Sequence, residues 1–384
     1  MMRDSETLRL APTVAIRVDS GHEIGSGHVR RCMSLAAFLV ANGFKPVFIC
    51  REIAGAITHV IEQAGFALVL LPEKESLAFS VFRSDFATAD FERMAGDAEE
   101  SADTFAHQYP GVQIAWVVTD HMLIRKPWQV AFASKTNCKV LAIDGQANSA
   151  HYADVLLDPQ IHENPVEKWA DLLPQHCVVF AGPSCLPLSQ AFESARNKAT
   201  VRQGPPNKVL VCFGGTDPED LVCRTVNASF TWVSQSTNPG IEVDVAVPAS
   251  LPSLTRLEAL FLNKPNFHLH VGLNDLSQLM LDASVAIGGG GIMLWERCLL
   301  GLPAIVVPLA QNQEKPIERL EAQGAVVSVK SRDGGYEFEL IKALQELSQN
   351  PAALRTMSKN AFKVMSDWPK TDGWLRVMKG SKHE

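Results

Sequence analysis

A short buried strand is expected to turn into a helix at the stretch Ile24-Gly25-Ser26-Gly27-His28-Val29-Arg30-Arg31. Before it, Thr13–Val18 is an apolar run of strand length. After it, Cys32–Leu39 is apolar at helical spacing and ends at Asn42-Gly43, a typical helix stop. Strand, glycine-rich turn and helix in this order are the repeating unit of α/β proteins, which bind ligands at such turns. The stretch therefore predicts a fold class and a first candidate site.

The turn has the composition of an anion-binding site. Gly25 and Gly27 flank Ser26 and let the backbone approach a ligand closely, while the free N–H groups of the helix start favour an anion. His28 would lie beside that anion. The helix dipole opposes a second positive charge there, so we expect a neutral imidazole, which suits a general base. The alternative is a tight connection without a ligand, with His28 as a partly exposed polar residue.

Strand-like runs alternate with helical ones along the rest of the chain. In the first half they are Pro46–Cys50, Ala67–Leu71, Ile114–Asp120, Lys139–Asp144, Val155–Leu157 and Cys177–Ala181. In the second half they are Val209–Phe213, Glu242–Val247, Phe267–Val271, Val285–Gly288, Ala304–Val307 and Ala325–Val329. Apolar strands separated by helices indicate parallel sheets covered on both faces. We therefore predict an α/β protein of two doubly wound, Rossmann-like domains.

Length and local composition give the predicted domain limits. A chain of 384 residues exceeds the usual size of one core. The polar, proline-bearing segment Arg196–Lys208 is typical of a linker, so we place the first domain at 12–200 and the second at 207–365. The tail 366–384 is expected to lie back on the first domain, and Ser84–Ala106 to form a helix on its outside. Two such domains are expected to bind ligands in a cleft at the carboxyl ends of their strands.

Composition excludes several classes of function. The net charge of −7 and the isoelectric point near 5.9 give no basic excess for binding nucleic acid or an anionic membrane. No apolar run approaches the ~20 residues of a membrane span, and the N-terminus lacks the apolar core of a signal peptide. The eight cysteines form no C-x-x-C pair, and the dispersed histidines form no recognisable metal-ligand set. We therefore expect a cytoplasmic protein without metal or cofactor.

Two glycine-rich turns follow predicted strands of the second half. The first is Gly214-Gly215-Thr216-Asp217-Pro218-Glu219, in which Asp217 or Thr216 is expected to cap a helix that begins at Pro218. A well-made strand-to-helix turn without a ligand would explain most of this motif. Gly214, Gly215 and Thr216 are nevertheless candidate ligand contacts.

The second turn carries a stronger signal. Ser284–Cys298 contains the run Gly288-Gly289-Gly290-Gly291, and four consecutive glycines favour a backbone that a ligand approaches, here a diphosphate bound at Gly289, Gly290 and Gly291. Glu296 interrupts the apolar helix that follows, and its carboxylate could accept bonds from two ribose hydroxyls. The alternative for Glu296 is an ion pair with Arg297 or another neighbour. Pro308–Gln313 offers the amides of Asn312 and Gln313 to sugar hydroxyls or acetamido groups.

These residues carry a family resemblance that runs through nearly the whole chain. The matching motifs are Arg17–Ser20 with Ile24–Val29 and Arg31-Cys32, then Asp120-His121, then Cys212–Asp217, and finally Gly288–Gly301 with Asn312-Gln313. They resemble the UDP-sugar hydrolases of pseudaminic acid biosynthesis, which have the glycosyltransferase B-type fold. That family removes UDP from UDP-2,4-diacetamido-2,4,6-trideoxy-β-L-altropyranose. Gly-X-Gly-His-Val followed by Arg-Cys is the specific part of the match and is shared with close relatives in surface-polysaccharide synthesis.

The resemblance implies roles for individual residues. His28 aligns with the family's catalytic histidine, Glu296 with its nucleotide-binding glutamate and Asn312 with a substrate-contacting asparagine. The matching motifs also put Arg31 and His121 among the residues expected to contact substrate. The first domain would then bind the sugar and carry out catalysis, and the second would bind UDP.

The chain departs from the family pattern at three places, all in the first domain. Met122 stands where an aromatic residue is usual. The turn Asp144–Asn148 lacks the usual acidic pair and arginine, and Ser184–Ser189 lacks the usual arginines. The UDP half therefore matches the family better than the sugar half.

The expected mechanism follows from the leaving group. UDP leaves the anomeric carbon as a stable anion, and amides at Gly214-Gly215 and Gly289–Gly291 could stabilise its charge. Neutral His28, oriented by Asp19 or Asp120, would take a proton from the attacking water, and single displacement predicts inversion. The only expected partner is the UDP-diacetamido-trideoxy sugar. Two alternatives remain open: a UDP-sugar-dependent glycosyltransferase, and a non-catalytic nucleotide-sugar binding protein.

Overall fold

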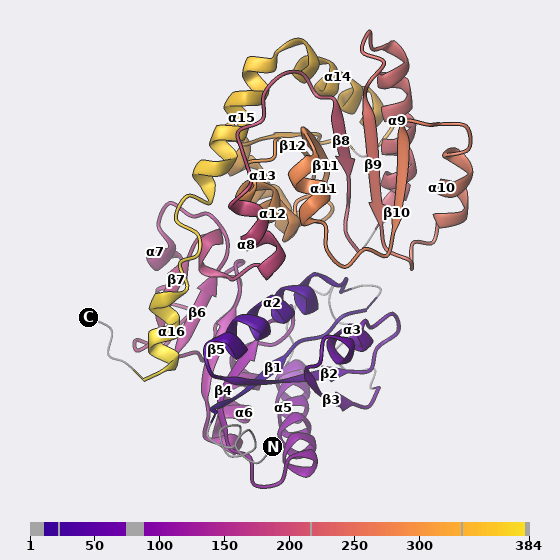
Figure 1. Ribbon diagram of the computed structural model, residues 1–384. Coiled ribbons are helices and arrows are strands. Elements are labelled where there is room, and N and C mark those ends of the chain that lie inside the picture. Colours follow the sequence, from indigo (N-terminus) through magenta and orange to yellow (C-terminus); the bar gives the residue numbers. More distant parts are fainter. Residues whose placement is uncertain (1–10, 22–23, 74–87, 216, 332, 381–384) are drawn as a thin grey trace, which may run out of the picture. The chain divides into compact units, whose positions relative to one another are not determined.

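The computed structural model describes residues 11–21, 24–73, 88–215, 217–331 and 333–380, and these form two compact units. One unit comprises the chain up to Pro187 together with the segment from Pro369 onward, and the other is Leu188–Trp368 (Figure 1). Each unit contains one sheet in which all strand pairs are parallel. This architecture confirms the predicted fold class of two doubly wound α/β domains.

The first unit has a seven-stranded sheet in the order β3-β2-β1-β4-β5-β6-β7. The strands are β1 Thr13–Arg17, β2 Lys45–Arg51, β3 Ala67–Leu71, β4 Ile114–Thr119, β5 Lys139–Ile143, β6 Val155–Asp158 and β7 Val178–Ala181. In the central strand, Ile16 lies opposite Phe48 of β2 and Val118 of β4. In the sheet, β1 lies between β2 and β4. From β1 the strand order proceeds toward β3 on one side, and from β4 it proceeds toward β7 on the other, so the switch point lies between β1 and β4.

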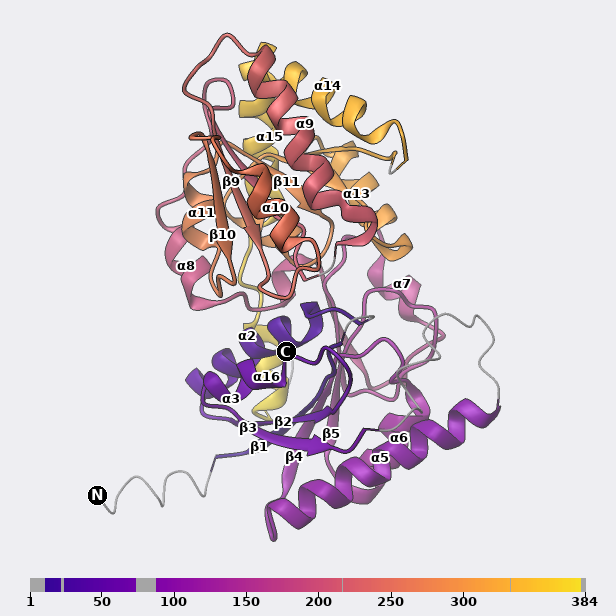
Figure 2. The ribbon, with the colours of Figure 1, turned by 90° about the vertical axis from the view of Figure 1, so that its right-hand side faces the viewer.

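Helices cover both faces of this sheet (Figure 2). The helices of the unit are α2 Gly27–Ala41, α3 Thr58–Gln63, α5 Thr88–Gln108, α6 Lys126–Thr136, α7 Pro165–Trp169, the 3-10 turn η1 Pro183–Cys185, and α16 Asp372–Met378. α2, α3 and α16 pack on one face and α5 and α6 on the other. Residues 84–87, with which the predicted outer helix begins, lie outside the described residues.

Helix α2 shows why the sequence forms this unit. Its buried residues include Val29, Cys32, Leu35 and Leu39, whose spacing of three and four puts them on one side of a helix. The helix ends at Asn42, whose backbone N–H donates to Phe38 and Leu39 carbonyls. His28 is thereby fixed in the first turn of a helix whose apolar side faces the sheet.

The second unit has a six-stranded sheet in the order β10-β9-β8-β11-β12-β13, with its switch point between β8 and β11. Its strands are β8 Lys208–Val211, β9 Glu242–Val247, β10 Phe267–Val271, β11 Val285–Gly289, β12 Ala304–Val307 and β13 Val326–Ser328. Its helices are α8 Gln190–Arg196, the 3-10 turn η2 Pro218–Asp220, α9 Leu221–Gln235, α10 Leu254–Leu260, α11 Ser277–Asp282, α12 Met293–Leu299, α13 Gln311–Ala322, α14 Tyr336–Gln349 and α15 Pro351–Val364. A large apolar core joins the sheet to α9, α14 and α15.

The break between the units falls at Pro187, earlier than the expected limit at residue 200. The segment Arg196–Lys208 is attached to the second unit, because Arg202 is buried and its guanidinium donates to four backbone carbonyls beyond the segment, besides that of Thr200 within it. The accepting residues are Met280, Leu281, Ala283 and Leu300. A polar composition alone could not reveal this anchoring. Within the described part of the chain, no helix combines the length and apolar character that crossing a membrane requires.

Candidate functional site

The switch point of the first unit brings together residues from two strand ends and one helix. β1 leads to Asp19, β4 leads to Asp120 and His121, and α2 carries His28 and Arg31. The backbone N–H of Asp120 donates to the carbonyl of Arg17 at 3.2 Å, which holds the two strand ends together. The sequence motifs of the first half therefore converge at this edge of the sheet.

His28 and Asp120 form a hydrogen-bonded pair. His28 Nδ1 lies 2.7 Å from Asp120 Oδ1, and the histidine side chain is 23% exposed whereas the carboxylate is fully buried. Burial opposes ionisation of Asp120, but Arg31 and His28 beside it hold the pKa of this carboxyl well below its usual value. Arg31 Nη2 also lies 3.2 Å from Nδ1, but the nearer Asp120 oxygen is ionised and can only accept, so we assign the proton to Nδ1. In the neutral ring the lone pair is then on Nε2. This is the arrangement of an oriented general base.

Arg31 binds the same carboxylate from the side. Its Nε lies 2.7 Å from Asp120 Oδ2 and its Nη2 lies 2.5 Å from Oδ1. The thiol of Cys32 also donates to Oδ2, at 3.4 Å. Both oxygens of Asp120 are thus occupied by protein donors. The predicted contact of Arg31 with substrate stays a prediction, and the geometry gives this residue a second task, holding Asp120.

Asp19 contacts a different histidine. Asp19 Oδ1 accepts from Arg17 Nη1 at 2.5 Å and from the backbone N–H of Arg51 at 2.7 Å, and its Oδ2 lies 3.1 Å from His121 Nε2. The backbone N–H of Leu123 donates to His121 Nδ1 at 3.0 Å. Both ring nitrogens of His121 therefore face protein groups. Of the two carboxylates expected to orient His28, it is Asp120 that contacts it, and Asp19 does not.

A buried charge network below the site was missed from the sequence. Asp97 of α5 accepts from Arg17 and Arg51 and from the indole N–H of Trp128, the last at 2.7 Å. Burial opposes ionisation, yet Arg17 and Arg51 lower the pKa of Asp97. The available signal was Arg17 itself, a cation inside an apolar strand, which needs a buried carboxylate as partner.

Two more Asp–His pairs lie at the carboxyl ends of the next strands. Asp144 follows β5 and its Oδ2 lies 3.0 Å from His151 Nε2; Asp158 ends β6 and its Oδ2 lies 3.0 Å from His162 Nε2. The pKa of each carboxyl is lowered, against the effect of burial, by its histidine and a nearby cation. The sequence did carry a signal, because four apolar runs of the first half each end in aspartate.

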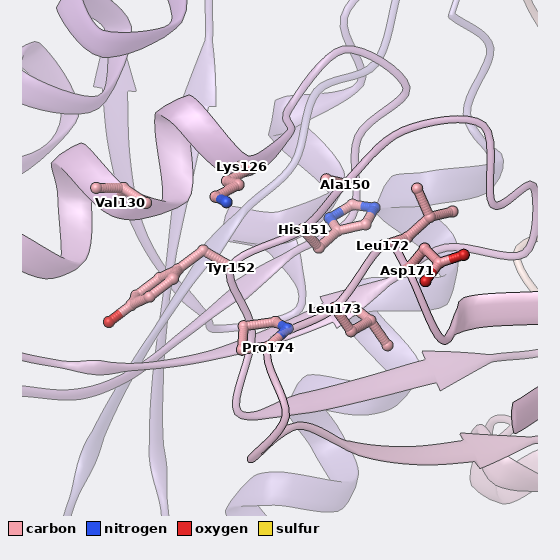
Figure 3. A pocket seen from close by; sticks show the side chains of 9 residues that line it. All are labelled: Lys126, Val130, Ala150, His151, Tyr152, Asp171, Leu172, Leu173 and Pro174. Atoms are coloured by element: carbon pink, nitrogen blue, oxygen red, sulfur yellow. The ribbon is translucent and has the colours of Figure 1, made fainter.

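A hollow of about 370 Å³ lies beside the start of α6 (Figure 3). It is lined by Lys126, Val130, Ala150, His151, Tyr152, Asp171, Leu172, Leu173 and Pro174. None of these described residues was predicted to bind substrate. Its inner wall includes His151, whose ring nitrogens are taken by Gln129 and Asp144.

In the second unit, the glycine-rich turn Gly288–Gly291, which begins with the last two residues of β11, is packed closely by the protein itself at three of its four positions. A Cβ at Gly288 would lie 1.9 Å from the Cys212 carbonyl oxygen, and one at Gly289 would lie 2.7 Å from the Leu309 side chain. A Cβ at Gly290 would lie 2.7 Å from the Ile317 side chain, whereas at Gly291 no atom lies within 4 Å. Packing thus accounts for Gly288, which faces a backbone carbonyl, whereas Gly289 and Gly290 face the ends of side chains and Gly291 faces open space. A diphosphate contact at Gly289–Gly291 stays a prediction.

Gln313 joins this turn to the loop after β12. Its Oε1 accepts from the backbone N–H groups of Gly290, at 3.1 Å, and Leu309, at 3.0 Å. The amide of Gly290, expected to hold a diphosphate, is thus bound to a side chain. Asn312 is exposed in the first turn of α13. Glu296 is half-buried on α12.

The turn after β8 differs from its expected form. Asp217 Oδ1 accepts from the backbone N–H of Val222 at 3.0 Å, so this residue does cap a helix, but α9 begins at Leu221 and not at Pro218. The delay arises because Glu219 and Asp220 adopt left-handed backbone conformations, with φ of 58° and 57°. Gly214 also has a positive φ, 95°, which favours glycine. Thr216 lies outside the described residues.

Arg297 is a further residue that sequence reasoning did not assign to the site. It is fully buried on α12, and its guanidinium donates to the carbonyls of Gly289, at 3.1 Å, and Cys212, at 2.8 Å. These carbonyls lie at the ends of β11 and β8, so Arg297 joins the two strands of the switch point. The guanidinium of Arg297 is thus bonded to carbonyls, while the charge of Glu296 raises its pKa against the effect of burial. An ion pair of Glu296 with another neighbour stays an alternative. In the described ranges, no three His, Cys, Asp or Glu side chains are grouped to hold a metal ion.

Comparison with known proteins supports the same division of the chain. Residues 209–368 match the model of the glycosyltransferase family 28 C-terminal domain. The spore coat polysaccharide biosynthesis protein SpsG of Bacillus subtilis is 29% identical over 152 residues, which is 39% of this chain and 43% of that protein. An uncharacterized protein of Methanocaldococcus jannaschii is 22% identical over 92% of this chain and 72% of its own length.

Solved structures extend the likeness to the whole fold. The structure of LpCGTa in complex with UDP aligns with a TM-score of 0.64 over 96% of this chain and 98% of that one, at 14% identity. Such identity shows the fold alone. The chain thus has the two-domain glycosyltransferase B-type fold, and its second unit is similar to the C-terminal domain of family 28 glycosyltransferases.

Proposed function

We propose that this chain is an enzyme that acts on a UDP-sugar, with the second unit binding UDP and the first unit binding the sugar and carrying out the chemistry. The match of residues 209–368 to a glycosyltransferase domain supports the first part, as does the likeness to a structure that contains UDP. The observation that carries the second part is the His28–Asp120 pair. It leaves the Nε2 lone pair of a partly exposed histidine available at the edge of the sheet.

His28 acts as the general base in this proposal. The oxygen of a hydroxyl or of water attacks the anomeric carbon, and its proton passes to His28 Nε2. The bond between the anomeric carbon and the phosphate oxygen breaks, and its electron pair leaves with UDP. Asp120 holds the ring and stabilises the imidazolium that forms. A single displacement of this kind inverts the anomeric centre.

The nucleophile distinguishes two candidate reactions. Transfer to an acceptor hydroxyl is favoured by the match to a glycosyltransferase domain. Hydrolysis is favoured by the stretch Gly25–Val29 with Arg31-Cys32, which resembles the UDP-sugar hydrolases of pseudaminic acid biosynthesis. Because the comparisons bear on the domain and the fold, transfer has the broader support, and hydrolysis of UDP-2,4-diacetamido-2,4,6-trideoxy-β-L-altropyranose is the more specific proposal.

One assay separates these reactions. The purified chain is given the UDP-diacetamido sugar in ¹⁸O-labelled water without an acceptor. Hydrolysis by anomeric attack gives UDP and a free sugar that carries the label at its anomeric hydroxyl, inverted in the first-formed product. A transferase releases UDP only after an acceptor is added. Label in a phosphate would contradict attack at carbon, and binding without turnover in any mixture would indicate a nucleotide-sugar binding protein.

A further inference from the structure

Arg297 is held in an unusual way. The side chain is fully buried, its two terminal nitrogens donate to the carbonyls of Gly289 and Cys212, and its Nε has no hydrogen-bond partner. Among the described residues, none of the ion pairs of the structure includes Arg297. A buried cation bonded only to neutral carbonyls is energetically costly, since part of its hydration is not replaced. Burial accordingly lowers the pKa of its guanidinium.

Two buried arginines of the first unit are paired with carboxylates. Arg17 and Arg51 are as deeply buried, but Asp97 contacts both of them, and Asp19 also contacts Arg17. Their charges are therefore compensated within the protein. Arg297 instead donates to two carbonyls, as buried Arg125 of the first unit also does, and the charge of Glu296 offsets its burial only in part. What distinguishes Arg297 from Arg125 is its position against the glycine-rich turn.

The position of Arg297 suggests what compensates it. The guanidinium lies against Gly288, where a Cβ would be 2.4 Å from Nη2, directly behind the turn that continues to Gly291. Gly291 is the member of that turn with open space around it. A negatively charged ligand group at Gly291 would therefore approach the turn Gly288–Gly291, which the guanidinium of Arg297 contacts at Gly288.

We propose that Arg297 is a positioning residue whose buried positive charge makes the turn Gly288–Gly291 selective for a diphosphate. It acts through the carbonyls that it holds and through its charge, which Glu296 compensates only in part, without touching the ligand. The ligand's negative charge in turn offsets the cost of burying Arg297. This inference rests on the proposed function, since it takes the diphosphate of a UDP-sugar as the occupant of the turn.

The test uses three ligands that share the base and ribose and differ in charge. Affinities of the full chain for uridine, UMP and UDP are measured by calorimetry or by competition for the wild type and for Arg297→Met. Removing one nearby charge should lower the UDP affinity by about tenfold or more and leave the uridine affinity within about twofold, with UMP between them. A turn that has merely collapsed would lose all three ligands alike, and that result would overturn the inference.

Arg202 supplies a matched control in the same unit. It too is buried and bonded to backbone carbonyls, but these precede β11 and β12, at the opposite ends of the strands. Arg202→Met should lower the thermal midpoint and leave the ratio of UDP to uridine affinity within about twofold. An equal loss of that ratio in both variants would show that any buried arginine of this unit has the same effect, and would contradict the proposal.

Arg297→Lys keeps the test decisive if the methionine variant does not fold. Lysine forms fewer bonds to the carbonyls and keeps the charge while its ammonium is protonated, which burial opposes, so the affinities are compared at about pH 6. There the preference for UDP over uridine should stay within about threefold of wild type even if stability falls. Loss of that preference in the lysine variant would overturn the role of charge. A wild type that binds UDP no better than uridine would overturn the proposed function first, whereas unchanged preference in Arg297→Met would overturn the inference alone.

Discussion

The two sheets differ at their carboxyl edges. In the first sheet, strands are followed by aspartates that pair with histidines. In the second sheet, two strand ends are joined by buried Arg297, which donates to the carbonyls of Gly289 and Cys212. The first edge contains groups that can exchange protons, among them His28 with Asp120. The second contains backbone groups and the fixed charge of Arg297. Two sheets of the same topology thus present different chemistry, because the residue type that follows each strand decides it. In the proposed function, the first edge transfers protons and the second binds a charged, unreactive group.

The largest effect should come from the proton-transferring edge. His28→Asn should lower turnover by about 10²-fold or more, because general-base help is typically worth 10² to 10⁴, and should leave UDP affinity near wild type. Turnover at saturating substrate and UDP binding by calorimetry are the measurements. His176→Asn is the control, since that side chain is 57% exposed and lies 3.9 Å from Asp154. A His28 variant with more than half of the normal activity would remove this residue from the chemistry.

The packed glycines of the second edge should respond next. Gly288→Ala puts a methyl group 1.9 Å from a backbone oxygen, so we expect a marked fall in thermal stability, of at least ~1–3 kcal/mol as overpacked cores show. Gly291→Ala meets no atom within 4 Å and should leave stability near wild type while weakening UDP binding. Thermal unfolding and calorimetry distinguish the two variants. Equal stability of both would show that packing does not account for the glycines.

A smaller effect is expected at Glu296. If its carboxylate accepts bonds from the ribose, such charge-assisted bonds are worth roughly 1.5–3 kcal/mol, and Glu296→Ala should weaken UDP binding about tenfold or more. The wild type should also prefer UDP to 2′-deoxy-UDP, and the variant should lose that preference. Glu318→Ala, an exposed carboxylate on α13, is the control. If Glu296→Ala still prefers UDP to 2′-deoxy-UDP as the wild type does, Glu296 does not contact the ribose.

The smallest and most gradual difference should appear on acidification. The pKa values of four carboxyls are lowered in the folded first unit, those of Asp19, Asp120, Asp144 and Asp158. These groups therefore stabilise the folded unit fully above about pH 4, where the carboxyls of the unfolded chain are ionised. As the pH falls below that value, this stabilisation is lost. In the second unit, burial raises the pKa of Asp217, which has the opposite sign, and the pKa values that are lowered belong to Glu337 and Glu339, which are partly exposed, so that solvent screens their contribution. Hydrogen exchange followed by mass spectrometry should therefore show loss of protection in the first unit at a higher pH. Simultaneous loss in both units would contradict this comparison.

The fold could be predicted because its determinants are local. Runs such as Thr13–Val18 and Ala304–Val307 are apolar over one strand length, and the turn before His28 has the expected glycines. The site could be predicted only in part. The contact of Asp120 with His28 depends on which strand end adjoins α2, and the packing of Gly288 depends on the carbonyl of Cys212, far away in the sequence. Helix α9 starts late because two residues adopt left-handed conformations that no local signal required.

Helix α16 has a consequence for how the chain is made. Trp374 is fully buried, its indole N–H donates to the Cys185 carbonyl at 2.9 Å, and its ring lies 5.4 Å from that of Phe38 on α2. Helix α16, which covers the same sheet face as α2, is synthesised after the whole of the second unit. The first unit therefore cannot complete this face until the end of translation. On the ribosome, the second unit, whose chain is continuous, can finish folding first, and the helix that bears His28 stays partly uncovered until translation ends. A separately expressed N-terminal half would keep that apolar face open and be prone to aggregate.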